Sequence, residues 1–76
     1  MVEHDMRQRK KLIQEMQEMV NERCHSNLTY QQVDYFVGKY MQNVSIEQWI
    51  DETDYNRNPV TADMILEKWN SYTFLA

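Results

Sequence analysis

Apolar residues recur at heptad-like spacing in the first third of the chain. Met6, Ile13 and Val20 repeat every seven residues, and Met16 falls on the companion position. The same stretch contains no glycine or proline and is rich in Gln, Glu, Met, Lys and Arg, which all favour helix. The pattern therefore predicts a long amphipathic helix over residues 3–24.

A single helix cannot hide its own apolar stripe, so the predicted helix must pack against something. One alternative is that it folds back onto the rest of the chain as ordinary core. The other is that it pairs with a second copy or enters a partner's groove. In that case Met6, Ile13, Met16 and Val20 form a dimer or docking seam, and we expect a homodimer. Two arginines interrupt the seam at positions where a strict coiled coil has apolar residues.

The remainder of the chain contains all nine aromatic residues and two helix-start motifs. Thr29 begins a Thr-x-x-Gln motif and Ser45 a Ser-x-x-Gln motif, and both match the capping box. Helical spacing of the apolar residues that follow predicts a second helix over residues 30–42 and a short third helix over roughly 46–52.

The last part of the chain predicts a loop and then a fourth helix. Residues 53–60 are polar, and Pro59 forces Asn58 towards an extended backbone. Thr61 is suited to cap the helix that follows. Aromatic side chains bury the most area per residue, so we expect four of them to form the core of this part of the chain: Phe36, Tyr40, Trp49 and Trp69.

Together these elements predict an all-α fold in one domain, residues 1–76. A long N-terminal amphipathic helix, 3–24, accompanies a compact, aromatic-rich head of about three shorter helices, 29–76. A chain of 76 residues buries only about 60% of its unfolded surface, so the core is marginal.

The cysteine content and the N-terminus indicate the compartment. Cys24 is the only cysteine, and a free thiol is typical of a reducing compartment. The N-terminus is charged from Glu3 onward, unlike a secretory signal. The longest apolar runs are two or three residues, against the roughly 20 that a membrane span needs. We expect a cytoplasmic protein that does not contact a membrane.

No residue pattern supplies catalytic chemistry. His4, Cys24 and His25 are the only soft metal ligands, and none has the spacing of a zinc site. Asp54 opens a calcium-like D-x-N-x-N sequence, but Pro59 stands where that loop requires glycine. A nucleophile pair of Cys24 with His4 would lack a group to orient the base. We therefore expect no catalytic residue, no metal and no cofactor, and a protein that is not an enzyme.

The net charge of −4 is unevenly distributed. Residues 1–26 carry five basic and five acidic groups, whereas residues 27–76 carry three basic and seven acidic groups. Four acids cluster at the predicted third helix and the loop after it: Glu47, Asp51, Glu52 and Asp54. Such a patch attracts a basic surface, and it can imitate phosphates at the basic site of a nucleic-acid-handling protein. We predict that it binds another protein with a basic surface.

The leading hypothesis is therefore a small acidic protein–protein interaction module that regulates or inhibits a larger protein by occluding a basic surface. The profile resembles, in type only, the small inhibitors and regulators that phages and mobile elements encode. No motif carries that resemblance, so no residue role is transferred by it.

Two alternatives remain open. Residues 28–47 can be aligned with a helix-turn-helix pattern, which implies a DNA-binding transcriptional regulator. The presumed recognition stretch, 39–46, holds one cation, so direct nucleic-acid binding is the less favoured alternative. A structural subunit that uses the helix over 3–24 as a permanent contact is the second alternative.

Overall fold

The residues that the structure describes form five α-helices joined by short connectors. The structure, a computed structural model, describes the backbone of residues 2–75 and the side chains of residues 8–74. The helices are α1 (Val2–Cys24), α2 (Tyr30–Tyr40), α3 (Ile46–Ile50), α4 (Glu52–Arg57) and α5 (Ala62–Leu75). No strand occurs among the described residues. The predicted all-α class and long N-terminal helix are confirmed. The described residues contain four shorter helices, where about three were predicted.

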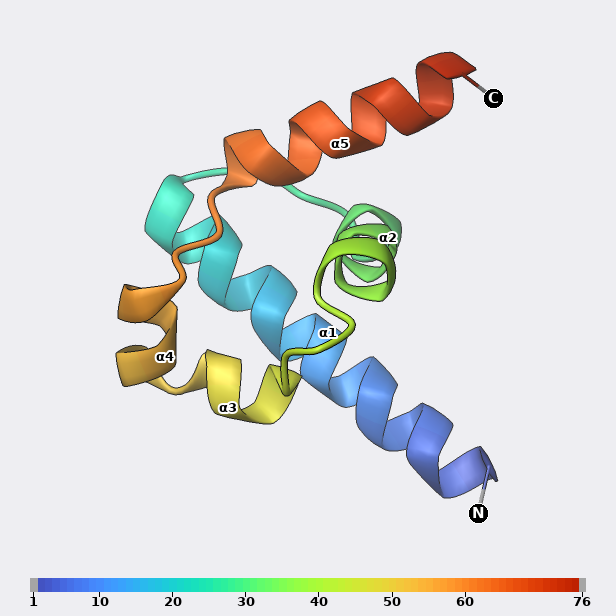
Figure 1. Cartoon of the computed structure of the whole chain (residues 1–76), viewed down its shortest axis with the longest axis vertical. Helices are drawn as coiled ribbons and strands as arrows, with labels where there is room; N and C mark the ends of the chain where they lie inside the picture. Colours follow the sequence, from blue (N-terminus) through green and yellow to red (C-terminus); the bar gives the residue numbers. More distant parts are fainter. Residues whose placement is uncertain (1, 76) are drawn as a thin grey trace.

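The shorter helices all lie on the same side of the long helix α1. Figure 1 shows α1 and α5 lying across the view, with α2 seen end-on between them, so α2 crosses both at a steep angle. Helices α3 and α4 lie beside the C-terminal half of α1. Helix α1 packs against α2, α3 and α5, and α2 also packs against α5. The N-terminal helix is therefore part of the domain rather than a projection from a separate head.

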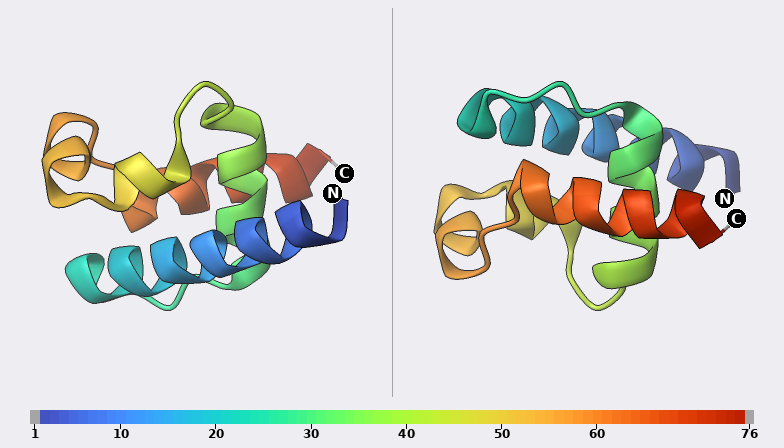
Figure 2. Two further views of the ribbon diagram at one scale, coloured as in Figure 1. Left: turned by 90° about the horizontal axis from the view of Figure 1, so that it is seen from below. Right: turned by 90° about the horizontal axis from the view of Figure 1, so that it is seen from above.

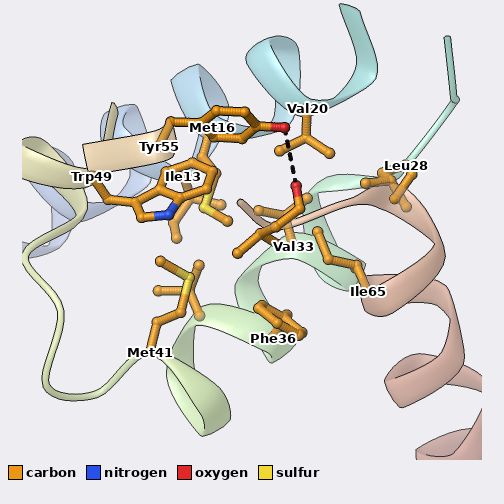
Figure 3. Close-up of a cluster of buried hydrophobic side chains, with 13 residues drawn as sticks. Ile13, Met16, Val20, Leu28, Val33, Phe36, Met41, Trp49, Tyr55 and Ile65 are labelled. Carbon is orange, nitrogen blue, oxygen red and sulfur yellow. Dashed lines mark hydrogen bonds between the residues drawn. The ribbon is translucent and has the colours of Figure 1, made fainter. Parts of the chain in front are cut away.

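The apolar stripe of α1 forms the base of the core. Ile13, Met16 and Val20 lie on one face of the helix, and all three are 0% exposed (Figure 3). They share a buried cluster with side chains from the other helices and connectors, including Val33, Phe36, Val37, Trp49 and Ile65. A fully buried side chain of this kind contributes about 1.5–3 kcal/mol.

This packing corrects the predicted seam. Ile13, Met16 and Val20 are occupied by the chain's own core, so they offer no exposed surface to a second copy or a partner. The fourth seam residue, Met6, has a side chain outside the described residues. Of the two alternatives for the stripe, the structure adopts the fold-back, because α2, α3 and α5 supply enough apolar area to cover it.

Helix α1 ends in a Schellman-type turn. His25 follows the last helical residue with a positive φ of 52°, and the N–H of Ser26 donates to the carbonyl of Asn21 at 3.1 Å. Glycine is the usual residue at this position, and a side chain there costs roughly 1–2 kcal/mol. The turn reverses the chain, which sends the connector back along α1.

Asn21 fixes that connector to α1. Its Oδ1 accepts from the N–H of Leu28 at 2.7 Å and from the hydroxyl of Ser26 at 2.8 Å. Its Nδ2 donates to the carbonyl of Leu28 at 3.1 Å, where Gln17 Nε2 also donates at 2.9 Å. Both backbone groups of Leu28 are thus satisfied while its side chain, 3% exposed, enters the core.

The three predicted helix starts are present, and at α5 the hydroxyl of Thr61 accepts from the N–H of Met64 at 3.3 Å. At α2 the capping box is complete: the N–H of Gln32 donates to Thr29 Oγ1, and Gln32 Oε1 accepts from the N–H of Thr29. At α3 the hydroxyl of Ser45 accepts from the N–H of Gln48. Both helices end two residues earlier than predicted, at Tyr40 and Ile50.

The predicted loop over residues 53–60 is wrong in its first half, because α4 occupies it. Asp51 closes α3 and caps α4, and its Oδ1 accepts from the N–H of Thr53 at 2.9 Å. Tyr55, 8% exposed, then packs edge-on against Trp49 with ring centroids 5.2 Å apart. The indole N–H of Trp49 donates to the carbonyl of Asn58 at 3.0 Å, which anchors the end of this short helix.

The expected aromatic core is half correct. Trp49 and Phe36 are buried, whereas Trp69 is half-buried and Tyr40 is 44% exposed. Tyr55, which the predicted loop excluded, takes a core position instead. Tyr40 is the last residue of α2, and Trp69 belongs to the C-terminal half of α5, which runs past the core (Figure 1).

Truncating the base of the core should be costly. We expect Ile13→Ala to lower the free energy of unfolding by about 2–5 kcal/mol, because the lost contacts leave a cavity under α2 and α3. Gln14→Ala, at the exposed neighbouring position, should change it by less than about 0.5 kcal/mol. Urea denaturation measures both, and equal midpoints for the two variants would show that α1 does not pack as described.

Removing the connector's anchor should also destabilise the fold. Asn21→Ala leaves the N–H of Leu28 without its acceptor, and we expect a loss of about 1–3 kcal/mol. Asn27, in the same connector, is exposed, so Asn27→Ala serves as the matched control with a change below about 0.5 kcal/mol. Thermal and urea denaturation report both values. A control that costs as much as Asn21→Ala contradicts the assigned anchor.

Candidate protein-binding surfaces

The structure brings three of the four predicted partner-binding acids together. Glu47, Asp51 and Asp54 line one shallow, open depression over α3 and the start of α4. Glu52 lies apart from that depression, and its Oε1 is 4.0 Å from Nη2 of Arg23 on α1. The predicted patch therefore continues around α4 towards α1 rather than forming a single spot.

The exposed face of α1 adds acids that charge counting along the sequence missed. Glu15, Glu18 and Glu22 recur at helical spacing and line a second shallow depression with Met19 and Arg23. Over residues 1–26 these acids are cancelled by cations. In space the cancellation is incomplete: Arg23 lies among these acids and Lys11 is one turn from Glu15, whereas the other described cations of that stretch, Arg9 and Lys10, lie further towards the N-terminus. Charge is segregated along the helix axis.

Arg23 joins the acids of α1 to those of α4. Its guanidinium lies 4.4 Å from the ring centroid of Tyr55, and it also reaches Glu52. We call residues 15–24 of α1, together with residues 46–57, which comprise α3, Asp51 and α4, the acidic end; it lies on the left in Figure 1. The acidic end carries seven carboxylates and two guanidinium groups, a net charge of −5, whereas the whole chain carries −4.

The carboxylates of the acidic end are accessible to solvent. Six of the seven are exposed, and Asp54 is half-buried. Exposed charges of this kind have little energy invested in ion pairs within the chain, since pairs at the surface contribute about 0–1 kcal/mol. They are therefore available to a partner. Asp51 is an exception in function, because its carboxylate also caps α4.

The basic cluster near the N-terminus is partly engaged within the fold. Arg9 Nη2 lies 2.9 Å from Oδ1 of Asp34 on α2, which explains a cation at a position where the heptad pattern requires an apolar residue.

The structure lacks a recognition helix where the helix-turn-helix alignment requires one. The recognition stretch of that alignment, 39–46, is mostly the non-helical connector after α2, and α3 itself has five residues and no cation.

Cys24 and His25, two of the three residues considered as soft metal ligands, lie at the C-terminal end of α1. Cys24 is half-buried, and its Sγ accepts from the N–H of Ala62 at 3.4 Å, so the thiol contacts the start of α5. His25 is exposed in the turn after α1. Within the part of the chain that the structure describes, no three or more His, Cys, Asp or Glu residues are arranged to hold a metal ion.

None of the helices over the described residues combines the length and the apolar content needed to cross a membrane.

A groove that the sequence did not predict lies between α2, α3 and α5. It has a volume of about 370 Å³, and its lining is mostly apolar, with residues that include Phe36, Tyr40, Val44, Trp49, Met64 and Lys68. The four-residue spacing of Met64 and Lys68 places both on one face of α5, and this spacing can be read from the sequence. The groove itself cannot be predicted from that spacing, because its other wall comes from α2 and a non-helical connector.

Comparison of the chain with protein-family models, with curated proteins and with solved structures finds no match. No residue role is therefore carried over from a relative.

Proposed function

We propose that this chain is a small protein-binding regulator or inhibitor that acts without catalysis, by occluding a basic surface of a larger protein. The observation that carries the proposal is the concentration of charge at the acidic end, where seven carboxylates meet only Arg23 and Arg57. The rest of the chain carries a net charge of +1, so the net negative charge of the protein comes entirely from the acidic end.

Physical chemistry supports this mode of action. A cluster of like charges on one part of a surface steers an oppositely charged partner and raises its association rate, an effect that salt screens over roughly 8–10 Å. Carboxylates one helical turn apart, such as Glu18 and Glu22, present anionic groups in a rigid row. The basic site of a nucleic-acid-handling protein is the first partner class to test, because it is built to receive a row of anions.

The proposal does not include a dimer through the predicted seam, because those side chains are buried. It places the protein in the cytoplasm, and the free Cys24 supports a reducing compartment. The type of small regulator that phages and mobile elements encode remains the model for this function.

Charge reversal tests the proposal with a control matched in net charge. Glu47→Lys combined with Asp54→Lys places four units of positive charge change on the acidic end. Asp63→Lys combined with Glu67→Lys makes the same change on α5, outside it. Asp54 and Asp63 both lie in the first turn of a helix, so the cost to the helix dipole is similar. Asp51 is left unchanged because it caps α4.

Each variant is immobilised and used to capture proteins from a lysate at low and at physiological salt. We expect basic proteins on the unchanged chain and on the α5 variant, with about tenfold or greater loss on the acidic-end variant. Competition by nucleic acid for the captured protein identifies the occluded site. Equal capture by both variants would refute the acidic end as the binding surface, and tight, salt-sensitive retardation of duplex DNA by the chain itself would favour the DNA-binding alternative.

A further inference from the structure

The groove described above has a buried floor and exposed walls. Phe36, Met41 and Trp49 lie at its floor and are at most 6% exposed. Tyr40 and Met64 form its walls and are 44% and 43% exposed. The connector between α2 and α3, which supplies Met41 and Val44, lies on the side of the molecule away from α1 (Figure 2). The groove is thus a surface separate from the face that α1 contributes to the acidic end.

Exposed apolar side chains gather around this groove. Among the described residues the large hydrophobic side chains with the highest exposure are Tyr40, Val44, Met64, Tyr72 and Phe74, and the first three line it. Tyr72 lies one turn beyond Lys68 on the same face of α5, and its ring centroid is 4.4 Å from the ring centroid of Tyr35. Single exposed hydrophobics are ordinary, whereas several around one concavity mark a place where another molecule binds.

Two lysines border this apolar surface. Lys68 Nζ lies 5.2 Å from the ring centroid of Tyr40, and Lys39 Nζ lies 5.8 Å from that of Tyr35. The ion pairs found among the described residues involve Arg9 and Arg23, so neither ammonium group has a carboxylate within 4.0 Å there. Glu67 precedes Lys68 on α5, but adjacent helical residues point about 100° apart. Lys68 is the charged side chain that lines the groove, so the rim of the groove is positive, the reverse of the acidic end.

We propose that this groove docks a short acidic amphipathic segment of a partner protein. Apolar side chains of that segment enter between Tyr40 and Met64, and a carboxylate pairs with Lys68. Lys68 already lies over an aromatic ring, so its ammonium is held at the rim beside the groove. A second copy of the chain fits less well, because pairing this face with itself brings the same lysines together. The inference does not depend on the proposed function of the acidic end.

A displayed library of random peptides of about twelve residues provides the probe, selected against the full chain. We expect enriched peptides to combine apolar residues at helical spacing with Asp or Glu. Their affinity should fall about tenfold or more for Lys68→Glu, where attraction becomes repulsion, and also for Val44→Glu. Lys11→Glu, an exposed lysine on α1, carries the same charge change and should alter affinity by less than about twofold.

Five outcomes would overturn the inference. Four concern binding: an absence of enriched peptides, enrichment of basic peptides, binding that Lys68→Glu and Lys11→Glu weaken equally, and Lys68-dependent binding of single-stranded DNA in place of peptide. The fifth is self-association through the groove. Light scattering distinguishes self-association: a doubled mass that Val44→Glu abolishes assigns the groove to a second copy. Circular dichroism and urea denaturation confirm that each variant is folded, and the acidic-end variant should bind the selected peptides as well as the unchanged chain does.

Discussion

The burial of the apolar stripe on α1 is the constraint on which the rest of the structure depends. Ile13, Met16 and Val20 are 0% exposed in a chain that has no disulfide. A domain of this size has a marginal core, and full burial of each such side chain contributes about 1.5–3 kcal/mol. Covering the stripe requires helices from three separate parts of the sequence to meet on the same side of α1.

That burial also determines what the protein presents to solvent. With one face of α1 packed inward, Glu15, Glu18 and Glu22 are directed outward. Trp49 of α3 belongs to the same core as the stripe, which places α3 and α4 beside the C-terminal half of α1. Acids from two distant segments therefore border one part of the surface. The cations at positions 9–11 lie nearer the other end of the helix, where Arg9 pairs with Asp34.

The groove has the same origin. Because α2 crosses both α1 and α5 steeply, its far end and the connector after it rise away from α1 (Figure 2). That leaves Tyr40, Val44 and Met64 around a concavity that none of the described helices covers. The molecule consequently carries two surfaces of opposite character. One is acidic and polar, and the other is apolar with Lys68 at its rim.

The sequence alone determined the class of the fold, the long helix and the starts of α2, α3 and α5, because these depend on local periodicity and on capping contacts within three residues, as at Thr29 and Ser45. It also predicted four of the seven carboxylates that make up the acidic end. It could not choose between folding back and pairing for the stripe of α1, since both satisfy the same pattern. It missed α4, a helix of six residues that Asp51 caps and whose Tyr55 packs on Trp49. The joining of the α1 acids to those of α3 and α4, and the existence of the groove, were decided only by tertiary structure, because each requires side chains more than twenty residues apart to meet in space.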